Sequence, residues 1–387
     1  MKYDFDSKVN RRNTDSVKWD VAPHVLPMWI ADMDFETVPA VKKALEKTVA
    51  HGIYGYATMP DEYFESISDF WFERFGYRFS PEDMVYSSGI VAAISSMVRK
   101  LTTPGEKVLL QSPVYNVFYN CILNNGRFVA ENKLLYEDGE YRMDFEDLEK
   151  KLSDPQTTLM IVCNPHNPVG NVWTREELAR IGDLCKKYGV TVISDEIHCC
   201  LTSPGVKYVP FASASEVCAD ISATCVAASK TFNLAGLQCS CVIAKNPALR
   251  YKIWRGINTD DVGEPNCFSM RATIAAYREG GEWLDQLNEY IYENKKYAVT
   301  ALAKAAPKMR VKVTDATYLL WVDVSAYATT SDRFVHDLQM MTGLRVCSGS
   351  AYGDGGEGFV RINLATQRSR VKEAIRRLCI YLESRIV

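Results

Sequence analysis

The sequence has no long apolar run and no surplus of positive charge. No apolar stretch approaches the roughly 20 residues that a membrane-spanning helix needs, and the charged start of the chain lacks the apolar centre of a signal peptide. The net charge of -3 offers no basic surface for nucleic acid or for acidic membranes. We therefore expect a cytoplasmic protein without nucleic-acid or membrane partners, and small neutral or anionic substrates remain open.

Closely spaced cysteine pairs and metal-binding spacings are also missing. None of the 12 cysteines forms a Cys-x-x-Cys pair, and several, such as Cys163, Cys225 and Cys241, lie in apolar runs typical of strands. We interpret them as reduced, mostly buried small hydrophobic residues. The five histidines are scattered and show no zinc-binding spacing with the cysteines, so we expect no metal.

The 387 residues, 47% of them apolar, are enough for two domains. In the middle of the chain short apolar runs alternate with helical patterns. The clearest helix begins at Thr174, with Glu177 three residues later in the spacing of a capping box. This alternation predicts an α/β domain with three layers and a mostly parallel sheet. The predicted strands are residues 107–111, 159–163, 190–193, 225–228 and 239–244.

Past about Gly281 the pattern changes to that of a smaller α+β unit. We expect a long helix over residues 282–306, a helix that begins at Ser331, and a last helix with one apolar face between Val371 and Leu382. The strands expected here are residues 311–313, 318–322 and 359–364. No repeat or linker-like segment separates the two parts. The predicted domains are a large one over residues 46–281 and a small one made of residues 1–45 and 282–387.

Three of the predicted strands are followed by polar residues of different chemistry, Asn167, Asp195 and Lys230. In an open α/β sheet the carboxyl ends of the strands line one crevice, so an amide, a carboxylate and an amine would meet there. That set suits pyridoxal phosphate, because the amine binds the aldehyde, the carboxylate the ring nitrogen and the amide the ring hydroxyl. Taken singly, the three residues would indicate a turn, a helix cap and an exposed lysine. Their occurrence together and in this order favours a cofactor site.

A glycine at the start of a predicted helix offers a site for an anion. Gly89 precedes a helix that runs to Lys100, and the free N–H groups and positive dipole end of a helix favour an anion. We choose Gly89, Ile90 and Val91 as the residues that bind the cofactor phosphate. Residues 353–358 have the spacing of a dinucleotide-binding loop, but they precede a strand and carry two acidic residues, so we reject that interpretation.

Several motifs resemble those of one enzyme family. Over essentially its whole length the chain resembles a fold-type I pyridoxal-phosphate enzyme of the aspartate aminotransferase superfamily. Within that superfamily it is most similar to the cystathionine β-lyase and cystalysin-like carbon-sulfur lyases. The motifs that carry the resemblance are residues 18–20, 27–35, 54–56, 164–168, 195–198 and 230–233.

The resemblance implies roles for the residues around Lys230. Asp195 would keep the pyridine nitrogen protonated, and Asn167 would donate to the ring hydroxyl oxygen. His198 stands where aminotransferases commonly have a tyrosine, and Tyr115 matches the aromatic residue that stacks on the cofactor ring.

The resemblance also implies a substrate site and a partner. Arg361 matches the arginine that binds the substrate α-carboxylate, and Ala31 and Trp29 would line the same pocket. Tyr56 resembles the tyrosine that reaches the phosphate from the neighbouring subunit, which implies a homodimer with shared active sites. With Lys230 and Asp195, Tyr56 completes the predicted catalytic set.

Two positions depart from the pattern of the aminotransferases. Ala227 stands where many relatives have a serine, which leaves Ser229 as the nearby hydroxyl that would contact the cofactor. Gln238 stands where aminotransferases commonly have an arginine. Together with His198, these departures favour elimination over amino transfer.

The sequence therefore predicts a pyridoxal-phosphate-dependent carbon-sulfur β-lyase for a small sulfur amino acid. With Lys230 as general base, cystathionine, cysteine or a related S-substituted cysteine would give pyruvate, ammonia and a thiol. Two alternatives remain. One is a class I/II aminotransferase, which uses the same lysine but returns the proton to the ring-side carbon. The other is a pyridoxal-phosphate-binding regulatory protein that works by binding a transcription factor.

Overall fold

A seven-stranded sheet forms the centre of the structure, a computed structural model that describes residues 2–384. All neighbouring strands are parallel except β10, which runs antiparallel to both of its neighbours. The prediction of a mostly parallel sheet is confirmed. In spatial order the strands are β2 (Met84–Ser87), β10 (Ser240–Ile243), β9 (Ser222–Val226), β8 (Thr191–Asp195), β7 (Thr157–Cys163), β3 (Lys107–Ser112) and β4 (Phe128–Lys133).

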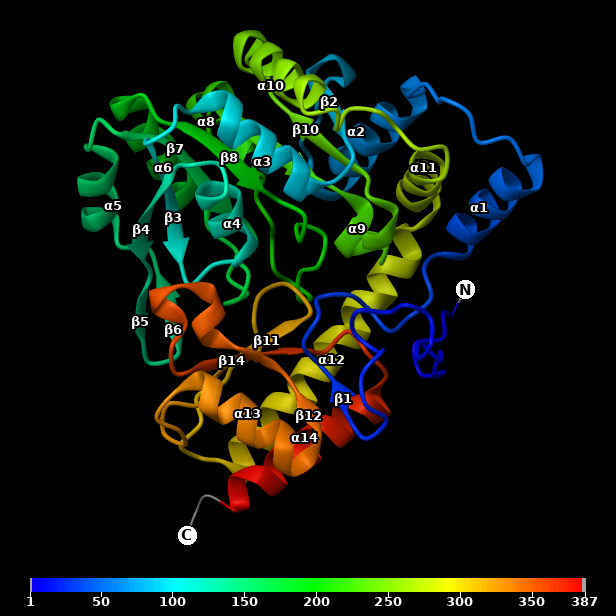
Figure 1. The fold of residues 1–387 in the computed structure, drawn as a ribbon, viewed down its shortest axis with the longest axis vertical. Helices are drawn as coiled ribbons and strands as arrows, with labels where there is room; N and C mark the ends of the chain where they lie inside the picture. Colours follow the sequence, from blue (N-terminus) through cyan, green and yellow to red (C-terminus); the bar gives the residue numbers. More distant parts are fainter. Residues whose placement is uncertain (1, 385–387) are drawn as a thin grey trace.

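Helices cover both faces of this sheet, which gives the three layers that the sequence predicts (Figure 1). Because side chains alternate along a strand, Val108 and Leu110 of β3 pack into one layer and Leu109 packs into the other. The first layer contains α3 (Ile90–Leu101), α4 (Val117–Leu123) and α10 (Pro247–Thr259). The second contains α5 (Phe145–Leu152), α6 (Arg175–Tyr188), α7 (Phe211–Ala214) and α8 (Glu216–Ile221).

The start of α6 shows how the local sequence sets the bounds of an element. The Thr174 hydroxyl accepts from the Glu177 backbone at 3.2 Å, and the Glu177 carboxylate accepts from the Thr174 backbone at 2.8 Å. These two bonds form the predicted capping box and satisfy N–H groups that the helix leaves free. Gly189, with φ 71°, ends the helix in the left-handed conformation.

A smaller α+β unit follows the sheet in the chain. The long helix α12 (Gly281–Ala305) leads from the region of the large sheet to this unit (Figure 1). The N-terminal strand β1 (Leu26–Pro27) pairs with β12 (Leu344–Arg345), so the start of the chain lies beside the small unit. The other elements are β11 (Leu319–Asp323), α13 (Ser331–Thr342), β13 (Cys347–Ser348), β14 (Phe359–Asn363) and α14 (Arg368–Glu383).

The predicted strand at residues 311–313 is wrong. These residues have no regular secondary structure, and they pair with no strand in the part of the chain that the structure describes. Next to them, Arg310 forms an isolated bridge with Asp323, the last residue of β11. The other strands and helices expected in this unit are present, with ends that differ by one or two residues.

We retain the predicted division into two domains as a proposal. Its first boundary lies inside α1 (Pro39–His51), and its last boundary lies in the first turn of α12. Phe5 and Phe35 of the N-terminal segment belong to the same apolar core as Tyr63 of α2 (Asp61–Phe75). Further elements are β5 (Leu135–Glu137), β6 (Glu140–Arg142) and α11 (Ser269–Glu279).

Within residues 2–384, no helix has both the length and the apolar character needed to cross a membrane. All 12 cysteines are free, and nine of them are buried. The interpretation of the cysteines as mostly buried residues is confirmed.

Candidate active site

The strand ends of the central sheet bring the three predicted polar residues to one edge. Asp195 is the last residue of β8, and Asn167 follows β7, the parallel neighbour of β8. Lys230 lies in the single turn α9 (Ala228–Thr231), directly after β9. The strand before the lysine ends at Val226, two residues earlier than predicted, because the chain turns at Ala227 into α9.

Most of the predicted cofactor residues line one cavity. It lies between the start of α3, the end of β8 and the turn that carries Lys230. The predicted residues that line it are Gly89, Ile90, Val91, Tyr115, Asp195, Ser229 and Lys230. Among the lining residues in the described chain, Lys230 carries the only positive charge.

Asp195 is a buried carboxylate with few partners. It accepts a hydrogen bond from the Ile197 backbone at 3.3 Å, and its exposed fraction is 3%. Burial raises the pKa of Asp195 to about 7, against the opposing effects of the Ile197 hydrogen bond and the charge of Lys230. A cationic N–H partner would stabilise the ionised form of such a buried carboxyl group.

The amine of Lys230 contacts a backbone carbonyl. Its Nζ atom donates to the Ala31 oxygen at 2.7 Å. Burial and then the positive charge of Arg361 lower the pKa of Lys230 to about 8, although Asp32 and Asp195 raise it. The amine therefore loses its proton closer to neutral pH than an exposed lysine does.

Arg361 lies on β14 of the small unit and points toward residues of both units. Its Nη1 donates to the Asn167 side chain at 3.2 Å, and its Nη2 donates to the Trp29 carbonyl at 3.0 Å. The guanidinium is buried, with its carbon 5.1 Å from the ring centre of Tyr352. Its Nε atom has no hydrogen-bond partner in the described chain. This nitrogen remains free for a carboxylate.

His198 is a buried, neutral imidazole beside these groups. Burial, and then the charges of Lys230 and Arg361, hold its pKa well below the usual range. Its Nδ1 has no partner among residues 2–384, and its ring meets that of Tyr318 edge to face at 5.9 Å.

The start of α3 has the backbone geometry of an anion site. Gly89 has φ 133°, a value that strains any residue with a side chain. A Cβ at this position would also lie 2.8 Å from Oε1 of Gln238. The helix start and Gln238 therefore approach each other closely across the glycine, beside Ser229 in the same cavity.

Six predicted residues lie outside the lining of this cavity: Asn167, His198, Arg361, Ala31, Trp29 and Tyr56. Ala31 and Trp29 present their backbone carbonyls to Lys230 and Arg361. Tyr56 is fully exposed in a segment without helix or strand, and it is absent from the cavity lining formed by the described residues. Its predicted contact lies in a neighbouring subunit, so this role stays a prediction.

Sequence reasoning missed Tyr318 and Asn363. The Tyr318 hydroxyl donates to the Ala31 carbonyl at 2.9 Å, and the Asn363 amide donates to the carbonyls of Ile30 and Asp32 at 2.5 and 2.6 Å. The one signal for them was their position within the predicted strands 318–322 and 359–364, which identifies no partner. Both residues bind backbone carbonyls. Every residue has a backbone carbonyl, so the amino-acid sequence does not identify the acceptor.

The fold and this set of side chains define a member of the aspartate aminotransferase superfamily. More narrowly, the chain belongs to the aminotransferase class I and II family, whose model matches residues 23–378. It is 43% identical over 381 residues to the cystathionine beta-lyase PatB of Bacillus subtilis, covering 97% of this chain and 98% of that protein.

Two solved structures are also similar to this chain. The first is cystalysin from Treponema denticola, with a TM-score of 0.96, 33% identity and coverage of 99% of this chain and 100% of that one. The second is the C-S lyase from Staphylococcus hominis, with a TM-score of 0.91, 33% identity and coverage of 99% and 98%. Both structures contain pyridoxal 5′-phosphate.

Proposed function

We propose that this protein is a pyridoxal-phosphate-dependent carbon-sulfur β-lyase. The observation that carries the proposal is the convergence of three elements: Lys230 and Asp195 line one cavity, and Arg361 lies close enough for its charge to lower the pKa of Lys230. An amine, a buried carboxyl group and a buried guanidinium suit an aldehyde, a ring nitrogen and a substrate carboxylate, respectively. The full-length similarity to cystathionine beta-lyase PatB supports the choice of reaction.

The polar groups of the site fit pyridoxal phosphate. When bound, this cofactor accepts the electrons released at the substrate α-carbon into its ring. Asp195 is buried, and within residues 2–384 it forms no ion pair and Lys230 is the one cation whose charge lowers its pKa, which suits a protonated ring nitrogen. Asn167 would hold the ring hydroxyl. The N–H groups at the start of α3 and the Ser229 hydroxyl would hold the phosphate.

Lys230 performs the proton transfers of the proposed reaction. Arg361 binds the α-carboxylate of the amino acid, with Nε as the free donor, and so orients the α-carbon. The neutral amine of Lys230 takes the α-proton, which its lowered pKa of about 8 permits near neutral pH. The thiolate on the β-carbon then leaves, and hydrolysis of the remaining fragment gives pyruvate and ammonia.

Pyruvate release from cystathionine without any keto acid tests the proposal. A lyase makes pyruvate in proportion to time over many turnovers. An aminotransferase, the alternative that the family model also allows, stops after about one equivalent per site. The Lys230→Ala variant should lose both pyruvate formation and the visible absorption of the lysine-linked cofactor, and retained lyase activity in this variant would contradict the assignment.

The enzyme is proposed to act as a homodimer in the cytoplasm. Tyr56 is fully exposed and its neighbours Ile53 and Tyr54 are largely exposed, which suits a segment that packs against a second subunit. Twelve free cysteines suit a reducing compartment. Light scattering of the purified protein at several concentrations measures the oligomeric state.

A further inference from the structure

Four successive backbone carbonyls, those of residues 29–32, accept hydrogen bonds from buried side chains of the small unit or from Lys230. Arg361 binds the Trp29 carbonyl, and Asn363 binds those of Ile30 and Asp32. The Ala31 carbonyl accepts from two donors, Lys230 at 2.7 Å and Tyr318 at 2.9 Å. We name residues 29–32 the carbonyl segment. Within it, Ala31 is the residue in contact with the reactive lysine.

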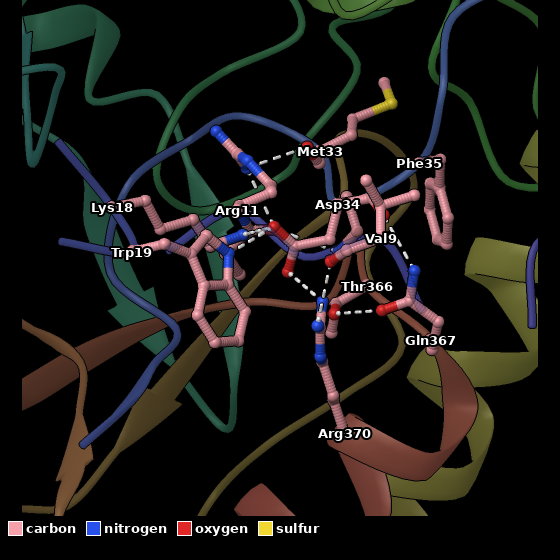
Figure 2. A network of polar contacts seen from close by, with 12 residues as sticks. Val9, Arg11, Lys18, Trp19, Met33, Asp34, Phe35, Thr366, Gln367 and Arg370 are labelled. Atoms are coloured by element: carbon pink, nitrogen blue, oxygen red, sulfur yellow. Dashed lines mark hydrogen bonds and ion pairs between the residues drawn. The ribbon is translucent and has the colours of Figure 1, made fainter. Parts of the chain in front are cut away.

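The chain on the C-terminal side of the carbonyl segment is held on two sides. Figure 2 shows Asp34 among cationic side chains, where its carboxylate lies 2.8 Å from Arg11 and 3.1 Å from Lys18. Asn233, three residues after Lys230, exchanges hydrogen bonds of 3.0 and 3.1 Å with the Met33 backbone. The turn that carries the lysine and the carbonyl segment are therefore fixed to each other.

Tyr318 completes this arrangement at the Ala31 carbonyl. Its side chain is fully buried, and in the described residues its hydroxyl makes a hydrogen bond with Ala31 alone. Burial raises the pKa of Tyr318, so the phenol keeps its proton and remains a donor at any working pH. A carbonyl oxygen has two lone pairs. Tyr318 occupies one of them and leaves the other for Lys230.

We propose that Tyr318 is a positioning residue for proton transfer: its hydroxyl fixes the Ala31 carbonyl as the acceptor for the protonated Nζ of Lys230. The inference rests on the proposed function, in which Lys230 takes the α-proton. In that step the proton moves to the lone pair of Nζ, and the electron pair of the C–H bond stays with the α-carbon.

The need for a neutral acceptor follows from the charges around Lys230. Arg361 disfavours a second positive charge, whereas Asp32 and Asp195 favour it. In the proposed complex Asp195 faces the ring nitrogen, so it stabilises the ammonium less. The Ala31 carbonyl then stabilises the ammonium through its dipole without a competing negative charge. If the Ala31 carbonyl were not held in place, it would stabilise the protonated Nζ of Lys230 less.

The Tyr318→Phe variant removes the hydroxyl and keeps the ring. Tyr63→Phe is the matched control, because Tyr63 is also fully buried and its hydroxyl also donates to a backbone carbonyl, that of Ser240 at 3.1 Å. The first readout is the exchange of the α-hydrogen of L-alanine in heavy water, followed by NMR with the holoenzyme. We expect exchange about tenfold slower in Tyr318→Phe, the effect of one well-placed hydrogen bond, and an almost unchanged rate in the control.

The second readout requires no turnover. Cofactor-free protein is mixed with pyridoxal phosphate at a series of pH values, and the rate at which the visible band forms is recorded. Only the neutral amine reacts, so the midpoint of the profile reports the pKa of Lys230. Loss of a fixed acceptor disfavours the ammonium, and the midpoint should fall by about half a unit or more in Tyr318→Phe.

Exchange within about twofold of the parent, an equal loss in Tyr63→Phe, or an unmoved midpoint in Tyr318→Phe would overturn the inference. These outcomes are separate from a failure of the lyase assignment. An aminotransferase also removes the α-proton with this lysine, so exchange would persist in a protein that releases no pyruvate from cystathionine.

Discussion

The amine of Lys230 and the backbone carbonyl of Ala31 lie 2.7 Å apart although 199 positions separate the two residues in the chain. The lysine follows a strand of the central sheet, and Ala31 belongs to an N-terminal segment that is bound to the small unit. The contact therefore joins the two parts of the molecule at the reactive nitrogen. A change on either side of it should alter the chemistry of Lys230.

Replacement of Asp195 by Asn should abolish most of the activity while the fold persists. The amide keeps the size of the side chain and can accept the Ile197 hydrogen bond, but it cannot supply the negative charge that the ring nitrogen needs. We expect kcat to fall by about 100-fold or more. Steady-state pyruvate assays measure the loss, and activity within a few fold of the parent would exclude this role for Asp195.

The same substitution should stabilise the cofactor-free protein at high pH. The folded pKa of Asp195 is about 7, above the ordinary value of 3.8. The folded state therefore holds the proton more tightly than the unfolded state, and the buried charge costs stability increasingly between about pH 4 and pH 7. Asp195→Asn should be more stable than the parent at pH 8 by up to roughly 4 kcal/mol, with a difference near zero at pH 4. Urea unfolding at both pH values tests the sign.

Replacement of Arg361 by Lys should weaken substrate binding. The lysine keeps the positive charge but loses the planar set of donors that meets a carboxylate and, at the same time, Asn167 and Trp29. We expect kcat/KM to fall by about 100-fold, with a rise in KM as the larger part. The exposed Arg376, paired with Glu373, is a control at which the same replacement should leave kinetics unchanged.

Gly89→Ala should release the cofactor more readily. Alanine is strained at φ 133° and its Cβ meets the Gln238 side chain, so the N–H groups at the start of α3 shift. The dissociation constant for pyridoxal phosphate should rise at least about tenfold. Gly76→Ala is the control, because Gly76 also has positive φ, at 66°, but has open space around it. Equal affinities in the two variants would exclude a phosphate site at Gly89.

Mixing two weakened variants tests the shared active site. In a mixed dimer of Lys230→Ala and Tyr56→Phe subunits, one site contains the lysine of one chain and the tyrosine of the other, both unchanged. Activity should therefore rise when the two variants are unfolded and refolded together, toward about a quarter of the parent value for random pairing. A mixture no more active than its separate components would argue against a Tyr56 that acts across subunits.

The large sheet and the centre of the site could be predicted because they depend on local patterns. Apolar runs of strand length end at Asp195 and shortly before Lys230, and parallel strands bring such ends together. The carbonyl segment could not be predicted in the same way. Tyr318 donates to a backbone carbonyl of this segment, that of Ala31. This hydrogen bond depends on how the N-terminal segment packs against the small unit.

Two other features could not be predicted from the sequence pattern. The run at residues 311–313 has the composition of a strand, yet it pairs with no strand within residues 2–384, and the isolated bridge beside it is formed by Arg310. Tyr56 is fully exposed, and the contact proposed for it lies in a second subunit, whose position no local pattern encodes.

The most direct test of the central claim is the amount of pyruvate formed from cystathionine by the purified holoenzyme without added keto acid. A carbon-sulfur β-lyase predicts pyruvate that rises linearly well past one equivalent per Lys230, with an equal amount of thiol released. Pyruvate or keto acid that stops at one equivalent, with no thiol, would contradict the account and favour amino transfer.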